Sequence, residues 1–207
     1  MMIVKGAQKP KISGEERRSE LIRIVFNEIA GKGFEGLRFQ EVAAAAGITN
    51  ATLYYYFPSK EAMIQSLVDW LLKDLSGTGE ATKRQFANAM HELQALFEDL
   101  YVRIAHDTRF FVVITELALR AQRDPAIAKI GRQRDRFWEQ GLRGILRRGI
   151  EDGSFRRDID VRATCLALMV QIKGIGHHAA MEERKPGEIR SIVDEIAAQV
   201  VTRLASA

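Results

Sequence analysis

The stretch NATLYYYFPSK, Asn50–Lys60, decides how this chain folds, because it places Tyr54, Tyr55 and Tyr56 side by side. In a helix each residue is turned about 100° from the last, so three neighbours sweep over half of the circumference. Three such rings cannot all face one core. The stretch therefore predicts a short helix that packs one ring inward and keeps one or two in solvent.

The residues before this stretch predict a partner helix. The segment FQEVAAAAG, residues 39–47, forms a short helix that Gly47 closes, since glycine readily adopts the positive φ of a tight turn. The turn residues ITN lead into a third helix, Asn50 to Phe57, and Pro58 ends it. Two short helices joined by a tight turn are the helix-turn-helix design, whose second helix enters the major groove of DNA.

Helices also flank this unit. Ser13 and Glu16 fit a capping box for a first helix that ends near Lys32-Gly33. Ser59 caps a fourth helix over residues 60–75, and SGTGE, Ser76 to Glu80, reads as a linker. Further helices are expected over 81–106, 108–122, 125–149, 160–181 and 187–204.

These segments predict an all-α fold of two domains. Residues 1–60 form a three-helix helix-turn-helix domain, helix 60–75 connects, and residues 76–207 form a helical ligand-binding and dimerisation domain.

The charge distribution, the apolar runs and the cysteine count narrow the class of protein. Residues 1–60 hold nine Lys and Arg against six Asp and Glu, a net charge of +3 out of +4 for all 207 residues. No apolar run reaches the length of a membrane helix, and the single cysteine, Cys165, excludes an internal disulfide and reads as inert core. We therefore expect a cytoplasmic protein without a membrane partner, whose basic excess favours a polyanion.

Several motifs are rejected. GKGFEG, residues 31–36, matches a dinucleotide fingerprint only in letters, because a helix precedes it where a strand is required. His177 and His178 point about 100° apart, so we expect no metal, and no cofactor is expected. KGIGH, residues 173–177, instead marks a close helix approach. No catalytic signature is visible, so the chain is not expected to be an enzyme. Two alternatives stay open: a helical enzyme, and a ligand sensor that acts through protein contacts.

The predicted helix-turn-helix indicates which residues could contact DNA. Asn50, Thr52 and the three tyrosines supply short polar or flat amphipathic side chains on the second helix. A tyrosine hydroxyl can donate to a phosphate while its ring packs on sugar or on a thymine methyl. Lys60 starts the next helix, close enough to hold a phosphate.

At this point the chain resembles a known family. AGITNATLYYYFPSKE, residues 46–61, within a match from about Arg17 to Leu72, resembles the DNA-binding domain of TetR-family transcriptional regulators, and GIEDGSFRRDID resembles the family's turn before its penultimate helix. The resemblance implies contacts to double-stranded DNA from Gln40, Thr49, Asn50, Ala51, Thr52, Tyr54, Tyr55, Tyr56 and Lys60. The second helix lacks the family's usual Ser or Thr cap, and Arg38 is expected to hold a phosphate instead. Tyr56 stands where the family commonly has histidine.

The rest of the chain is expected to hold a partner copy and a ligand. The dimer surface is expected from one stripe on each of the last two helices: Leu166, Met169, Val170, Lys173 and His177 on the first, and Ile189, Ile192, Val193, Ile196 and Val200 on the second. The alternative is that both stripes pack within one copy. An apolar or amphipathic effector is expected against Phe97, Tyr101, Phe110, Phe111, Phe137, Trp138, Met169 and His177.

These expectations combine into one mechanism. A homodimeric repressor binds a palindromic operator through recognition helices about 34–36 Å apart, or a multiple of that spacing. A small-molecule effector that favours another spacing releases the DNA. The helix over residues 60–75 is expected to carry the shift, because it joins both domains.

Overall fold

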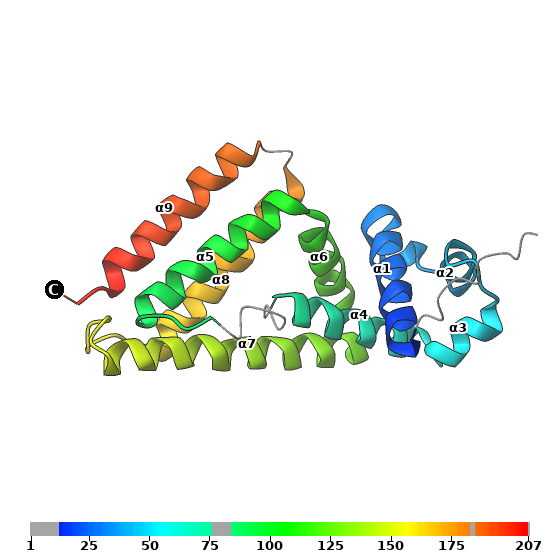
Figure 1. The fold of residues 1–207 in the computed structure, drawn as a ribbon, viewed down its shortest axis with the longest axis horizontal. Helices are drawn as coiled ribbons and strands as arrows, with labels where there is room; N and C mark the ends of the chain where they lie inside the picture. The colour runs from blue at the N-terminus through cyan, green and yellow to red at the C-terminus, as the bar shows by residue number, and fades with distance from the viewer. Residues whose placement is uncertain (1–12, 76–83, 183–184, 207) are drawn as a thin grey trace, which may run out of the picture.

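A computed structural model describes residues 13–75, 84–182 and 185–206, and most of these are helical, which confirms the all-α prediction (Figure 1). The elements are α1 (Gly14–Lys32), η1 (Phe34–Gly36, a 3-10 helix), α2 (Phe39–Ala45), α3 (Asn50–Tyr56), α4 (Lys60–Leu75), α5 (Ala89–His106), α6 (Arg109–Ala121), α7 (Pro125–Glu151), α8 (Val161–Met181) and α9 (Pro186–Leu204). Helices α1 to α3 form one end of an elongated molecule, and α5, α8 and α9 lie toward the other.

Helix α1 begins and ends as the sequence predicts. Ser13 and Glu16 form the capping box, in which the Ser13 hydroxyl accepts from the Glu16 N–H at 3.2 Å and the Glu16 carboxylate accepts from the Ser13 N–H at 2.8 Å. Gly33 follows the helix with φ of 72°, which a residue with a Cβ rarely adopts. GKGFEG is therefore an interhelical turn, as expected, although the sequence did not predict the 3-10 helix η1 within it.

Helices α2 and α3 form the expected helix-turn-helix pair. Gly47 has φ of 63°, and the Ile48 N–H donates to the Ala43 carbonyl at 3.0 Å across the turn. Val42, Ala43 and Leu53 are buried between the two helices and α1. The Arg17 guanidinium of α1 donates to the Ala46 carbonyl at 3.0 Å, which fixes the end of α2 against the first helix.

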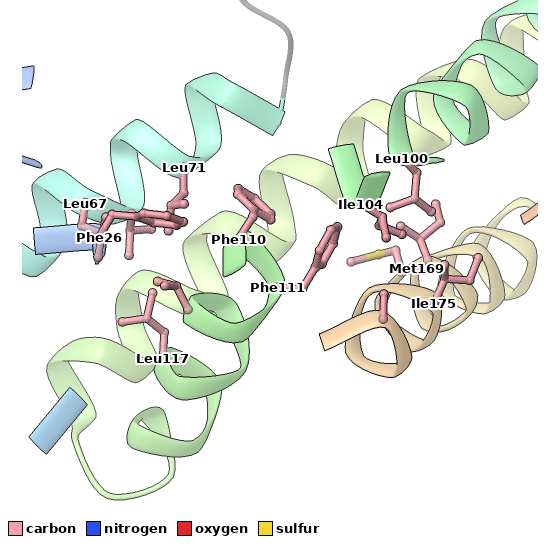
Figure 2. Packing of buried hydrophobic residues seen from close by; sticks show 14 of the residues in the cluster. Phe26, Leu67, Leu71, Leu100, Ile104, Phe110, Phe111, Leu117, Met169 and Ile175 are labelled. Atoms are coloured by element: carbon pink, nitrogen blue, oxygen red, sulfur yellow. The ribbon is translucent and has the colours of Figure 1, made fainter. Parts of the chain in front are cut away.

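One hydrophobic core runs through both parts of the molecule. Figure 2 shows Leu67 and Leu71 of α4 around Phe26 of α1, Phe110 of α6 next to them, and the cluster continuing through Phe111 to Met169 of α8. Helix α4 packs on α1 and on α7, and α6 packs on α1, α7 and α8. The helix-turn-helix unit is therefore joined to the rest by α6 as well as by α4.

Helix α7 runs along one side of the C-terminal helices (Figure 1). It contacts α4, α5, α6 and α8, and Asp124 caps its start: the carboxylate accepts from the Ala126 and Ile127 N–H groups. Helix α8 comes so close to α6 that a Cβ on Gly176 would lie 2.3 Å from the Phe111 ring. This confirms the predicted close helix approach in KGIGH.

Helix α5 starts later than the sequence suggests. The prediction placed its beginning at residue 81, but residues 84–88 are not helical, and the Asn88 side chain caps the helix by accepting from the His91 N–H at 3.0 Å. Asparagine competes well for the N-cap position, which explains the later start. The predicted linker, Ser76 to Glu80, lies outside the described residues.

Candidate nucleic-acid interface and regulatory surfaces

The start of α3 is built for a polar contact. The Thr49 hydroxyl accepts from the Thr52 N–H at 3.2 Å and lies 3.0 Å from the Thr52 hydroxyl. Leu53 is fully buried and anchors the helix. All four predicted contact residues at this end are exposed: Thr49, Asn50, Ala51 and Thr52. A capped, anchored helix thus presents its N-terminal residues to solvent, as a recognition helix does.

The three tyrosines occupy three different environments. Tyr55 is 84% exposed and meets the ring of Tyr56 edge-on, with centroids 5.3 Å apart. Tyr54 is 52% exposed, and one face of its ring is covered by Phe39 of α2. Tyr56 is half-buried and packs on the core. The structure thus turns one ring inward and two outward, as the sequence predicts; Tyr54 and Tyr55 are called the tyrosine face below.

The start of α2 adds polar groups to the same end of the molecule. Arg38 occupies the N-cap position without a side-chain capping bond, and both it and Gln40 are exposed. Glu41 is the acid in this first turn, and Lys32 binds its carboxylate at 2.9 Å. This bond to Lys32 holds the pKa of Glu41 below its ordinary value, so the negative charge is matched by a cation.

Lys60 is half-buried at the start of α4, and it is tied to the core by an aromatic ring. Its Nζ lies 4.7 Å from the centroid of the buried Phe34 ring. The guanidinium carbon of Arg120, from α6, lies 5.2 Å from the same centroid. The predicted phosphate-binding lysine therefore shares Phe34 with a residue of the regulatory region.

Further polar bonds join α6 to the segment η1. The Glu116 carboxylate accepts from the Phe34 N–H at 3.0 Å, and Arg120 pairs with Glu35 at 2.8 Å. Arg109 at the other end of α6 donates to Asn27 of α1 at 3.3 Å. A displacement of α6 would therefore strain the N-terminal unit directly. That α4 carries such a shift stays a prediction, and α6 provides a second connection beside it.

The predicted ligand residues divide between the core and the surface. Phe97, Phe110, Phe111 and Met169 are buried, and Tyr101 and Trp138 are partly buried. Phe137 is 65% exposed and His177 is exposed, so these two side chains lie outside the core. Helical spacing cannot tell which side of α7 or α8 meets a neighbour, and a ligand contact at any of these residues stays a prediction.

A groove runs between α5 and α9. It has a volume of about 430 Å³, and Phe97 and Val193 line it together with the ion pair of Glu98 and Arg190. Of the predicted ligand residues only Phe97 belongs to its lining.

The predicted dimer residues divide as well. Leu166 is 44% and Val170 is 70% exposed on α8, beside the exposed Lys173; these three are called the α8 face below. Lys173 pairs with Asp135 of α7 at 2.6 Å. Burial raises the pKa of Asp135, but Lys173 and Arg134 together outweigh it and hold that pKa below its ordinary value. The α8 stripe therefore includes side chains that a second copy can reach.

The α9 stripe is different. Ile189, Val193 and Val200 are at most 6% exposed, and Ile192 and Ile196 are partly buried against the same core. Within one copy α9 packs on α5 and α8, which is the internal packing given above as the alternative. The expectation that α9 and Met169 also belong to a dimer seam stays a prediction.

Four residues with clear contacts were missed by sequence reasoning. They are Phe34, Phe39, Glu116 and Arg120. Glu116 is 82 residues from its partner Phe34, so no local pattern signals the contact. Phe39 is the first residue of α2, the helix before the turn. An aromatic residue at that position, close in sequence to the tyrosines of α3, is a signal that could have predicted the contact.

The remaining features of the described part of the chain concern metal ligands, membrane-spanning helices and the cysteine. Over residues 13–75, 84–182 and 185–206, no three His, Cys, Asp or Glu side chains gather as metal ligands. Over the same ranges, no helix has both the length and the apolar character that a bilayer crossing needs. Cys165 is buried, its Sγ lies 3.6 Å from the Glu139 carbonyl, and burial raises the pKa of the thiol.

Known proteins share both halves of this arrangement. A family model described as bacterial regulatory proteins, tetR family, matches residues 26–67, and one described as BetI-type transcriptional repressor, C-terminal, matches residues 89–202. The HTH-type transcriptional repressor KstR2 of Mycobacterium tuberculosis (strain ATCC 25618 / H37Rv) is 30% identical over 160 residues, which cover 73% of this chain and 76% of that protein.

Solved structures agree in fold. A TetR transcription regulator from Haloarcula marismortui superposes with a TM-score of 0.80 at 20% identity, covering 93% of this chain and 100% of the other. FadR from Bacillus subtilis, solved in complex with stearoyl-CoA, has a TM-score of 0.77 at 21% identity, covering 89% and 98%. From the two matched models and the relative, the chain belongs to the TetR family of bacterial regulatory proteins and is a DNA-binding transcriptional regulator.

Proposed function

We propose that this regulator is a homodimeric repressor of a two-half-site operator, released when an apolar or amphipathic small molecule binds its regulatory region. The observation that carries the proposal is the tyrosine face on the capped helix α3, where Tyr55 is 84% exposed. A soluble fold gains nothing from leaving such a ring in water, whereas groove or phosphate contacts would bury it.

The proposed DNA contacts come from three neighbouring segments. Thr49, Asn50, Ala51 and Thr52 at the start of α3 meet base edges and phosphates together with the tyrosines. Arg38 and Gln40 at the start of α2 and Lys60 at the start of α4 hold flanking phosphates. The exposure of Arg38, Gln40 and the start of α3, the capping of α3 and the match of residues 26–67 to the family model support this assignment.

The α8 face supports the proposed dimer. Leu166 and Val170 are aliphatic side chains left in solvent along one side of a helix, and a two-fold partner would bury both on each copy. A dimer is needed because one short recognition helix covers too little DNA for tight, specific binding.

The proposed effector acts on α6. Phe110 and Phe111 at the start of this helix face the core, while Glu116 and Arg120 further along bind η1. A molecule that enters beside the phenylalanines would move α6 and pull on the N-terminal unit. The FadR relative solved with stearoyl-CoA supports an apolar or amphipathic effector. To shift occupancy from 99:1 to 1:99, its affinities for the two states must differ by about 5.5 kcal/mol.

The test is selection of bound sequences from a pool of random duplexes, each long enough for two half-sites. We expect an inverted repeat with half-sites about one helical turn apart, or a multiple of it. Affinity for the selected duplex should fall linearly on a log–log plot against salt, because phosphate contacts release counterions. A pool that shows no enrichment would rule out the repressor and favour a sensor that works through protein contacts.

A further inference from the structure

Phe39 and Tyr54 form the closest aromatic pair at the DNA-binding end of the described chain. Their ring centroids are 4.6 Å apart and their planes differ by 19°, so the rings lie nearly parallel and stacked. Phe39 is the first residue of α2, and Tyr54 lies in the middle of α3. The contact therefore crosses from one helix of the helix-turn-helix unit to the other.

The stack gives Tyr54 a property that Tyr55 lacks. Both rings are more than half exposed, but one face of Tyr54 rests on Phe39, while Tyr55 has only an edge-on contact with its neighbour Tyr56. A ring held against a flat partner has fewer rotamers to lose when it binds. We therefore expect the Tyr54 ring to hold one orientation in the free protein, and the Tyr55 ring to be able to change its orientation on binding.

Phe39 is itself held in place. It is half-buried against the core, at the point where α2 begins, and its neighbours Val42 and Ala43 are buried. Arg17 fixes the other end of α2 through the Ala46 carbonyl. The ring of Phe39 is therefore attached to a rigid element, and it transfers that rigidity to a solvent-exposed side chain on α3.

We propose that Phe39 is a positioning residue for DNA recognition: it contacts no DNA of its own and presets the Tyr54 ring for the duplex. This inference rests on the proposed function of the tyrosine face. Phe39 lies outside the recognition helix, and its substitution is expected to change the affinity for DNA through the Tyr54 side chain.

The experiment compares Phe39→Leu with Phe39→Tyr, using the duplex that the wild-type chain selects from the random pool. Leucine keeps the apolar volume and removes the flat ring face, whereas tyrosine keeps that face. We expect Phe39→Leu to weaken binding about threefold to tenfold at fixed salt, the range of an aromatic stack, and Phe39→Tyr to bind as the wild type. Thermal unfolding of each variant reports any loss of fold.

A double-mutant cycle separates positioning from a structural role. In the Tyr54→Ala background the ring to be positioned is gone, so Phe39→Leu should cause no further loss of affinity. A purely structural role would give the same loss in both backgrounds, and it would overturn the inference. Wild-type affinity in Phe39→Leu, or an equal loss in Phe39→Tyr, would overturn it as well. These outcomes leave the repressor proposal intact, because that proposal fails only if the wild type selects no duplex.

Discussion

The tyrosine face of α3 and the α8 face both leave large apolar side chains in solvent, but their chemistry differs. Tyr54 and Tyr55 are flat rings that carry a hydroxyl, next to exposed polar residues of α3. Leu166 and Val170 are aliphatic and carry no polar group. Amphipathic rings suit a wet, charged partner such as DNA, whereas branched aliphatic side chains suit a second protein surface. The kind of exposed side chain thus distinguishes the two proposed partners.

The largest effect is expected from Val170→Asp on the α8 face. The side chain is 70% exposed in one chain, so the monomer should fold, but a two-fold contact would bury two carboxylates without partners. We expect the dimer to weaken by about 3–5 kcal/mol, measured by sedimentation across a concentration series. Val102→Asp is the matched control, since Val102 is 54% exposed on α5. An unchanged dimer in Val170→Asp would show that another surface holds the copies together.

The tyrosine face is tested by Tyr55→Ala. Because this ring is 84% exposed, its removal should leave the melting temperature unchanged, while affinity for the selected duplex falls by about 1–3 kcal/mol. Tyr55→Phe then separates the hydroxyl from the ring. Binding equal to that of the wild type at fixed salt would remove Tyr55 from the interface.

The inner side of α8 should respond differently from its outer side. A Cβ on Gly176 would lie 2.3 Å from Phe111, so we expect Gly176→Ala to destabilise the fold by about 1–3 kcal/mol. Gly174→Ala is the control on the same helix, because nothing lies within 4 Å of the added Cβ. It should instead gain about 0.5–1 kcal/mol from helix propensity. Urea unfolding measures both, and equal stabilities would contradict the close approach of α6 and α8.

The smallest effect is expected away from both faces, at Asp152. Its carboxylate accepts bonds from the Ser154 hydroxyl and from the Ala89 N–H at the start of α5, and these bonds hold the pKa of Asp152 below its ordinary value. A lowered folded pKa means that the stabilisation is present at neutral pH and is lost as pH falls below about 4.

In Asp152→Asn the free energy of unfolding should therefore fall less between pH 7 and about pH 3 than in the wild type, as measured by urea unfolding at both pH values. Asp158→Asn, at an exposed carboxylate, serves as control and should keep the wild-type slope. An identical slope in all three proteins would mean that the Asp152 bonds add nothing to stability.

Local signals predicted the N-terminal unit well. The capping box at Ser13, the positive φ at Gly47 and the burial of Leu53 among exposed neighbours all follow from residues within a few positions of one another. The all-α fold and the family membership follow from the same signals. Helix periodicity also predicted that Tyr54, Tyr55 and Tyr56 would divide between core and solvent.

The regulatory region was predicted less well at the level of residues. An amphipathic stripe shows that one side of a helix is covered, but it does not say whether the cover comes from the same chain or from a second copy. Val193 and Val170 illustrate this, because both are valines of apolar stripes, yet the first is 2% and the second 70% exposed.

The sequence by itself determined the order of the α-helices, although not the start of α5, and it determined that α3 would expose aromatic surface within a helix-turn-helix unit. Only the tertiary structure decided that Phe39 covers Tyr54, that Glu116 and Arg120 bind the segment around Phe34, and that α9 is covered by its own chain. The physical reason is the range of the interactions. Turns, caps and periodicity depend on neighbours along the chain, whereas these contacts join helices whose relative placement depends on the packing of the whole core.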